Sequence, residues 1–287
     1  MRASCHRLIH GEAEGVPGLI IDQYADRWLV ATRDRDAPEW LKPLLMGLGL
    51  EAPTVFYKSL SRGNAKEPPV RWWGELPARF VVKEEGVRFE VDLEQGYSSG
   101  LFLDQRDNRA WLRERVRELG TGCRVLNLFS YTCSFSVVAA MEGAVTENVD
   151  LSKRALEWGQ RNMELNQLTR ETHFWWATDV RKQLGILQRR QSRFDAIVVD
   201  PPTFGRGKRG GKPFVLEDDM PLILKICGEL LHARGCLIAS CNAERLPSGK
   251  LCEWVERVFA RDFKCQEVGA PEDHPRAGYW QAVRVWG

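Results

Sequence analysis

RVLNLFSYTCSFSVVAAMEGAVTENVD, residues 124–150, is the stretch that decides the fold. It begins with an apolar strand at 125–129, continues through the turn SYTCS at 130–134 and a helix of small residues at 135–141, and ends with a second short strand at Asp150. This order predicts a βαβ unit. The free N–H groups at the start of the helix then face a crevice at the carboxyl end of the first strand, and an acid that ends the second strand can accept the hydroxyls of a ribose. The stretch is therefore typical of a nucleoside site.

The turn between the first strand and the helix indicates which nucleoside fits. A dinucleotide site requires the pattern G-x-G-x-x-G, which lets the backbone approach a pyrophosphate, whereas residues 130–134 contain no glycine. For the turn alone, an ordinary crossover without any ligand is an equally good interpretation. Taken together with Asp150 and the acids that follow later strands, the turn favours S-adenosylmethionine, which has no phosphate.

Composition and charge exclude several classes of protein. A chain of 287 residues predicts one large or two modest domains, and a net charge of +2 gives no overall nucleic-acid signal, so any basic surface must be local. Eight cysteines without a C-x-x-C pair, in a chain without a secretory signal, predict a reduced, cytoplasmic protein. Cys–His spacing predicts no metal site, and the absence of a long apolar run predicts no membrane span.

The chain changes its pattern near residue 95. Residues 1–95 predict a small, hairpin-rich α+β domain for RNA or substrate binding, with turns at 25–26 and 84–86. Residues 96–287 alternate helical and apolar strand patterns, which predicts an α/β domain with a mainly parallel sheet covered on both faces. The last two strands, within 263–269 and 279–286, are expected to form an antiparallel edge pair.

Polar residues follow several of the predicted parallel strands. They are Asp150, Asp179, Asp200 and Cys241. Because parallel strands end at one edge of a sheet, and because ligands of such sheets bind outside that edge, we expect these four side chains to surround one site.

Six segments of the chain are similar to one family. They are RLIHGEAEGVPGLIIDQY (7–24), GLFLDQRDNR (100–109), VLNLFSYTCSFSVVAA (125–140), NVDLSKRALEWGQRNMELN (148–166), DPPTF (200–204) and DHP (273–275). In these segments the chain resembles the class I S-adenosylmethionine-dependent RNA methyltransferases, and most closely the 23S ribosomal RNA methyltransferases that include the 5-methylcytosine enzymes and a related guanine-N7 domain. The resemblance implies a Rossmann-like, seven-stranded class I methyltransferase domain after the α+β domain. The family often carries an N-terminal PUA domain, which we expect this chain to lack.

The resemblance also implies roles for individual residues in binding S-adenosylmethionine. Asp150 would hold the ribose, Asp179 the adenine amino group, and the 130–134 turn the methionine part. Where the family usually has a Gly-Gly pair, this chain has Cys133 and Ser134, so we expect a shifted turn and a narrower approach to the cofactor. The complete predicted cofactor set is Gln105, Arg106, Asn108, Asn127, Phe129, Ser130, Tyr131, Thr132, Asp150, Leu151, Ser152, Asp179, Val180 and Asp200.

The polar run 104–108 has two interpretations. Asp104 or Asp107 could cap the helix that follows. Alternatively, Gln105, Arg106 and Asn108 would close the cofactor pocket, as the resemblance implies.

Cys241 carries the most specific chemical prediction. C5 of cytosine is a poor nucleophile, and the family's cytosine enzymes place a cysteine of a Ser-Cys pair here, whose thiolate would attack C6. An inert buried cysteine is the other interpretation. Asp200, Pro201 and Pro202 would form a rigid turn against the base edge, and Phe204 would stack on the base, so these residues and Cys241 form the predicted catalytic set.

Two alternatives to the cytosine enzyme remain open from the sequence. The D-P-P-T-F motif also fits methylation of guanine at N7 or N2, and a non-catalytic RNA-binding protein with a decayed cofactor turn is a third interpretation. The glycine-rich basic segment GRGKRGGK, 205–212, is suited to phosphate contacts. The predicted partner is ribosomal RNA, 23S in particular, with no membrane, and a homodimer is left open.

Overall fold

The computed structural model describes residues 5–34, 36–47, 54–61, 67–95, 98–169, 171–202, 204–205, 212–243, 245–274 and 280–287. The chain divides into two compact units, one of residues 1–106 with 271–276, the other of residues 107–270 with 277–287. The sequence places the boundary at 95/96. Residues 98–106 remain with the first unit because the Ser99 hydroxyl lies 2.9 Å from that of Tyr24, while the Ser99 carbonyl accepts the Asp92 N–H at 3.0 Å.

The first unit is built on a five-stranded sheet in the order β1-β2-β3-β4-β5. Its core lies where α1 packs on the sheet, around Leu41, Leu45 and Trp28. Both predicted hairpins are confirmed, because β2 pairs with β3 and β6 pairs with β7, each antiparallel. The elements are β1 (Cys5–His10), η1 (Gly11–Glu14), β2 (Leu19–Tyr24), β3 (Arg27–Thr32), α1 (Leu41–Gly47), β4 (Thr54–Ser59), β5 (Val70–Trp73), β6 (Arg79–Glu84), β7 (Val87–Asp92) and η2 (Leu103–Gln105).

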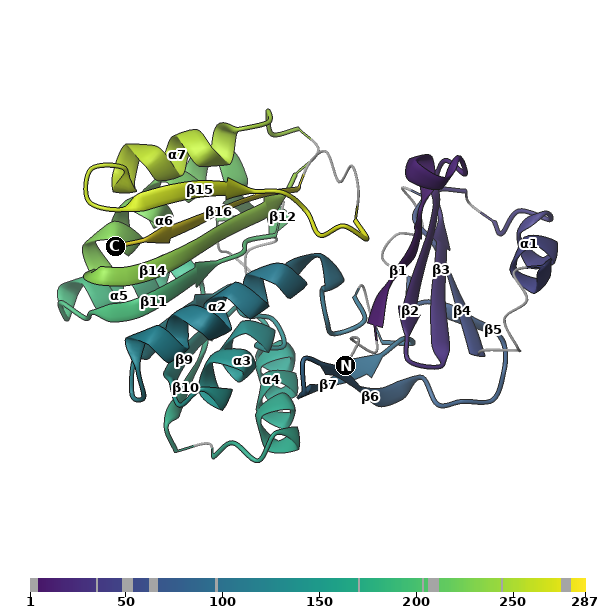
Figure 1. Cartoon of the computed structure of the whole chain (residues 1–287), viewed down its shortest axis with the longest axis horizontal. Coiled ribbons are helices and arrows are strands. Elements are labelled where there is room, and N and C mark those ends of the chain that lie inside the picture. The colour runs from purple at the N-terminus through teal and green to yellow at the C-terminus, as the bar shows by residue number, and fades with distance from the viewer. Residues whose placement is uncertain are drawn as a thin grey trace. The chain divides into compact units, whose positions relative to one another are not determined.

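The second unit contains a seven-stranded sheet in the order β10-β9-β8-β11-β14-β16-β15 (Figure 1). The chain starts in the middle at β8, runs outward through β9 and β10, and returns to β11 on the other side of β8, so the strand order reverses between β8 and β11. Such a reversal opens a crevice at the carboxyl ends of the strands. The strands are β8 (Arg124–Leu128), β9 (Val145–Asp150), β10 (His173–Ala177), β11 (Phe194–Val199), β14 (Leu231–Asn242), β15 (Lys264–Val268) and β16 (Trp280–Trp286).

The last two strands differ in one respect from the expectation. They pair antiparallel, as predicted, but β16 also pairs antiparallel with β14 and therefore lies inside the sheet, so only β15 is an edge strand. The sequence could not show this insertion, because an interior antiparallel strand and an edge strand both give a short apolar run.

Helices cover both faces of the sheet in the second unit (Figure 1). On one face, α5, α6 and α7 pack on strand residues such as Leu126, Ile197 and Val283 to form the main core. On the other face, Arg113 of α2 binds Glu142 at the end of α3, and the side chain of Arg284 in β16 reaches Asn108 of α2. The helices are α2 (Arg106–Leu119), α3 (Ser134–Met141), α4 (Lys153–Leu165), α5 (Val180–Arg189), α6 (Leu216–Leu230) and α7 (Lys250–Phe259), and a short strand pair, β12 (Phe204–Gly205) with β13 (Phe214–Val215), precedes α6.

Candidate active site

The predicted acids of the second unit lie at one edge of its sheet, the carboxyl edge. Asp150 ends β9, and its carbonyl accepts the N–H of Thr178 at 3.0 Å, directly before Asp179. On the other side of β8, Asp200 follows β11, and Ser240 in β14 donates a hydrogen bond of 2.8 Å to its carboxylate. The strand register thus brings Asp150, Asp179 and Asp200 to the same edge, as the sequence predicts.

The turn between β8 and α3, residues 129–134, has an unusual backbone for a segment without glycine. Phe129, Tyr131 and Cys133 all have left-handed φ values, of 58°, 47° and 61°. Non-glycine residues rarely adopt this conformation, and such strain is concentrated at functional sites. The turn is held by the Ser130 N–H on the carbonyl of Val149 at 3.0 Å, and by the Tyr131 N–H on Asp150 Oδ2 at 2.9 Å. The chain therefore maintains a glycine-like turn through its contacts with the end of β9.

Cys133 is fully buried beneath this turn. A methyl group placed on Gly159 of α4 would lie 2.5 Å from the Cys133 sulfur, so the thiol packs directly against the bare backbone of that glycine. From the sequence, a side chain at position 133 is expected to narrow the approach to the cofactor. Instead, the thiol fills the space between the turn and α4.

This contact makes Gly159 a sensitive position. Gly159→Ala is expected to lower the free energy of unfolding by about 1–3 kcal/mol, because the new methyl group overlaps the Cys133 sulfur in a packed interior. Gly185→Ala is the matched control, since this helical glycine has only the end of the Arg189 side chain nearby, at 3.5 Å; the exchange should be neutral or stabilising by about 0.5–1 kcal/mol. Urea unfolding measures both changes, and equal effects would contradict the packing described here.

Asp150 is prepared to accept further hydrogen bonds. Its two carboxylate oxygens accept the N–H groups of Tyr131 and Ser152, at 2.9 and 2.7 Å. Burial raises the pKa of the Asp150 carboxyl, and these backbone N–H groups counteract the rise. The Leu151 N–H also donates to this carboxylate, and because an ionised carboxylate has about four acceptor sites, Asp150 keeps the capacity to accept a further hydrogen bond. Ser152 also caps α4, because its hydroxyl accepts the N–H of Ala155 at 3.2 Å.

Two other predicted residues in or next to the turn form hydrogen bonds with α3 and α4. The Asn127 amide donates to the Ser136 hydroxyl of α3 at 2.8 Å, and the Thr132 carbonyl accepts from Asn162 at 3.0 Å. Ser130 differs, because its hydroxyl is buried near the Cys133 thiol but has no hydrogen bond of ordinary geometry within the described part of the chain. Buried polar atoms normally have a hydrogen-bond partner, so the Ser130 hydroxyl is suited to bind the methionine end of S-adenosylmethionine.

Asp179 is both a helix cap and half of an ion pair. Its carboxylate accepts the N–H of Arg181 at 2.9 Å at the start of α5, and the Arg181 guanidinium binds both carboxylate oxygens, at 3.0 and 2.7 Å. These bonds hold the pKa of Asp179 below its usual value. Val180, the first residue of α5, is buried. Asp179 therefore presents an oriented, ionised carboxylate at the carboxyl edge.

Cys241 lies in β14, next to the residue that binds Asp200. Its side chain belongs to the core cluster beneath α5, α6 and α7 and is 1% exposed. Burial, reinforced by the negative charge of Asp200, raises the pKa of the Cys241 thiol to about 12. Cys241 therefore lies near the end of β14, at the carboxyl edge as predicted, but its buried surroundings keep the thiol protonated at neutral pH.

The remaining predicted residues fall into three groups. Gln105 and Arg106 belong to the first unit, where Arg106 binds Asp273 of the D-H-P motif at 2.5 Å, and Asn108 in the second unit accepts a hydrogen bond from Arg284 at 3.0 Å. Pro201 is buried and Pro202 exposed. Thr203, the side chain of Phe204 and residues 206–211 of the basic segment lie outside the described residues.

Two residues without a predicted role also belong to the carboxyl edge. Phe214 of β13 contacts Phe129 of the turn, edge to face, with ring centres 5.1 Å apart. Arg181 binds Asp179, as described above. Its position two residues after a predicted site acid was the only signal in the sequence, and a basic residue in the first turn of a helix is usually solvated.

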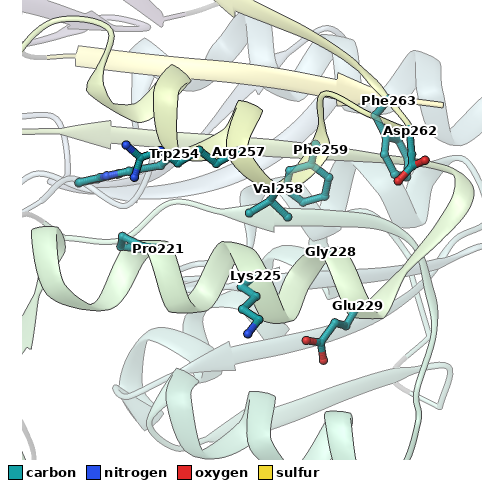
Figure 2. Close-up of a pocket in the computed structure, with 10 residues that line it drawn as sticks. All are labelled: Pro221, Lys225, Gly228, Glu229, Trp254, Arg257, Val258, Phe259, Asp262 and Phe263. Carbon is teal, nitrogen blue, oxygen red and sulfur yellow. The ribbon is translucent and has the colours of Figure 1, made fainter.

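A groove of about 560 Å³ lies elsewhere, between α6 and α7 (Figure 2). Pro221, Lys225, Trp254 and Phe259 are among its lining residues, and no predicted site residue is one of them. The candidate site therefore rests on the strand ends and not on this groove. The described residues contain no group of three or more His, Cys, Asp or Glu that could hold a metal ion. Among the helices described, none is both long and apolar enough to cross a membrane.

The fold and the polar carboxyl edge together define a class I methyltransferase domain, and solved structures share it. The protein SMU.776, determined as a complex with S-adenosylhomocysteine (SAH), superposes with a TM-score of 0.85 at 27% identity, over 99% of this chain and 76% of that one. An S-adenosylmethionine-dependent methyltransferase from Agrobacterium tumefaciens gives a TM-score of 0.79 at 25% identity, over 100% and 91% of the two chains.

Sequence comparison identifies the family. The model of the S-adenosylmethionine-dependent methyltransferase family matches residues 65–276, and the chain belongs to this family. Ribosomal RNA large subunit methyltransferase I of Shewanella denitrificans is 37% identical, over 98% of this chain and 74% of its own. Ribosomal RNA large subunit methyltransferase K of Neisseria meningitidis is 34% identical, over 88% and 70%. The protein is an S-adenosylmethionine-dependent methyltransferase, and S-adenosylmethionine is its cofactor.

Proposed function

We propose that this enzyme methylates C5 of a cytosine in large-subunit ribosomal RNA, 23S in bacteria, with Cys241 as the nucleophile. The observation that carries the proposal is the similarity, along nearly the whole chain, to relatives named ribosomal RNA large subunit methyltransferases. A cysteine at the carboxyl edge, beside the residue that binds Asp200, supports the choice of cytosine. With ribosomal RNA as the substrate, we expect the enzyme to act in the cytoplasm.

In this proposal the residues of the carboxyl edge divide the binding of the cofactor among them. Asp150 accepts a ribose hydroxyl with the acceptor capacity that its backbone N–H partners leave free, and Asp179 accepts the adenine amino group. Ser130 and the rest of the β8–α3 turn hold the methionine part. When bound, the cofactor supplies an electrophilic methyl group, and the task of the protein is to align that group with the base carbon.

Cys241 would activate the base. Its thiolate adds to C6 of cytosine, so that electron density moves to C5 and C5 takes the methyl group. Transfer of the C5 proton to a water molecule, with departure of the thiolate from C6, then restores the aromatic ring and the free cysteine. Asp200, held by Ser240, and the rigid Pro201-Pro202 turn would fix the base edge, and Phe204 would stack on its face. A base within a helix must first be flipped out to reach these groups.

The environment of Cys241 predicts a characteristic pH dependence. With a thiol pKa of about 12 in the free enzyme, the thiolate fraction, and with it kcat/KM, should rise about tenfold per pH unit between about pH 7 and pH 9. Methyl incorporation into ribosomal RNA measures the rate, and SAH binding in the same buffers controls for changes in cofactor affinity. A rate that does not change over this range would contradict catalysis by a cysteine whose thiol is protonated in the free enzyme.

Methylation of guanine at N7 or N2 is the second candidate, because burial and Asp200 both oppose ionisation of Cys241. In this case Asp200 and the following prolines would orient a base nitrogen, which needs no covalent activation. Mass-spectrometric mapping of ribosomal RNA from cells with and without the gene separates the candidates. The proposal requires the loss of a 5-methylcytosine, and the loss of a methylguanine alone would replace it with the alternative.

A further inference from the structure

The Arg181 side chain has an exceptional set of partners for a residue in the first turn of a helix. Its guanidinium binds both oxygens of Asp179, the carboxylate of Asp219 at 3.2 Å, and the carbonyls of Lys212 and Pro213 at 2.7 and 3.2 Å. Nε, Nη1 and Nη2 all take part, so the five N–H donors of the guanidinium all have acceptors. These contacts hold the guanidinium in one orientation and connect the residues that bind it.

These partners come from two functionally different places. Asp179 is the acid that the proposed function assigns to the adenine of the cofactor. Lys212 and Pro213 lead directly into β13, which pairs with β12 through Phe204 opposite Val215. β12 follows the Asp200-Pro201-Pro202 turn on the side assigned to the RNA base. One guanidinium therefore joins the cofactor side of the site to the strand pair on the substrate side.

Two further contacts hold the same strand pair. Asp219, which is 6% exposed, accepts the N–H of Val215 at 2.9 Å while it binds Arg181. Phe214 of β13 packs edge to face on Phe129 of the β8–α3 turn. Without the guanidinium, Asp219 would be a buried carboxylate without its cation, and the carbonyls of Lys212 and Pro213 would lose their donor. Such a loss has consequences well beyond those of a surface ion pair.

We propose that Arg181 is a positioning residue shared by the two substrates of the enzyme, orienting Asp179 toward the adenine of the cofactor and β12–β13 toward the RNA base. The inference rests on the proposed function, because it takes the roles of Asp179 and of the D-P-P segment from it. Arg181 does not touch the reacting atoms in this proposal. Its loss should therefore weaken the binding of both substrates and leave the rate of the bound complex nearly unchanged.

The substitutions Arg181→Ala and Arg181→Lys test this inference. Lysine keeps the positive charge but cannot form the planar fork on Asp179. We expect the Kd for SAH and the KM for the ribosomal RNA substrate each to rise about tenfold in Arg181→Ala and about threefold or more in Arg181→Lys, with kcat within about threefold of the wild type. Arg189→Ala, at the exposed end of the same helix, is the control and should change neither constant.

Asp219→Asn separates the two sides of the arrangement. It removes the charge of one partner of Arg181 on the β12–β13 side and keeps the two hydrogen bonds between the Arg181 guanidinium and Asp179. The KM for the RNA should therefore rise, while the Kd for SAH stays at the wild-type value. If Arg181→Ala does not fold, as judged by thermal unfolding, Arg181→Lys and Asp219→Asn decide the question.

Unchanged constants in Arg181→Lys and Arg181→Ala, or a fall in kcat with both constants unchanged, would overturn the shared positioning role, as would an effect on only one substrate. Failure of the proposed function gives a different result. In that case the wild-type enzyme itself binds SAH but forms no 5-methylcytosine in ribosomal RNA.

Discussion

Asp150→Asn is expected to weaken the binding of SAH about 100-fold. The substitution removes a charged acceptor, and hydrogen bonds to charged groups contribute about 1.5–3 kcal/mol each, so the loss of those to the ribose accounts for a factor of this size. An asparagine amide also replaces one of the two oxygens of Asp150, which now accept the N–H groups of Tyr131 and Ser152, by an NH2 group that cannot accept. The left-handed Tyr131 then loses part of its support. Isothermal titration calorimetry with SAH measures the change.

Asp195→Asn is the matched control for this experiment. Asp195 lies near the start of β11, at the opposite edge of the same sheet, and its carboxylate also accepts a backbone N–H, that of Arg124, at 2.8 Å. The substitution is chemically the same, but Asp195 lies at the opposite end of the strands from the proposed site, so SAH affinity should not change. Equal losses in the two variants would mean that the affinity reports the integrity of the sheet and not a ribose contact.

Cys241→Ala should reduce methyl transfer to ribosomal RNA by about 1,000-fold or more, because nucleophilic activation of C5 has no substitute in the site. SAH affinity should remain at the wild-type level, since none of the cofactor contacts involves this thiol. The cavity left by one sulfur atom in the core beneath α6 and α7 lowers stability by about 1 kcal/mol, which leaves the protein folded. Single-turnover measurements with saturating cofactor separate the chemical step from binding.

Cys227→Ala controls for the structural part of this effect. Cys227 of α6 is fully buried in the same core cluster and lies outside the predicted site. Its loss should give a similar decrease in stability and leave methyl transfer unchanged. Full activity of Cys241→Ala would contradict the cytosine mechanism and favour the guanine alternative.

The sequence was sufficient for the parts of the fold that depend on local pattern. The small-residue helix after a buried strand and the acid at Asp150 predict the central βαβ unit, and the structure contains it. The positions of Asp150, Asp179 and Asp200 at one edge follow from the rule that parallel strands end together. These predictions hold because periodicity and strand direction are properties of contiguous segments.

The features that the sequence did not reveal depend on contacts between distant segments. The sequence shows that residue 133 is a cysteine and not a glycine, and therefore that a side chain is present. The direction of that side chain depends on Gly159, which lies on another helix. In the sequence, Arg181 resembles a solvated residue because its partners Lys212, Pro213 and Asp219 lie more than 30 residues further along the chain. The burial of Cys241 likewise results from the packing of α6 and α7 on β14.

The most direct test of this account uses the purified enzyme, S-adenosylmethionine with an isotopically labelled methyl group, and 23S ribosomal RNA that lacks its natural modifications. After digestion to nucleosides, chromatography with mass spectrometry shows which base carries the label. We expect labelled 5-methylcytidine, and its amount should fall strongly in the Cys241→Ala enzyme and, at a cofactor concentration that does not saturate the variant, in the Asp150→Asn enzyme. Label in a methylated guanosine, or no transfer by an enzyme that binds SAH, would contradict it.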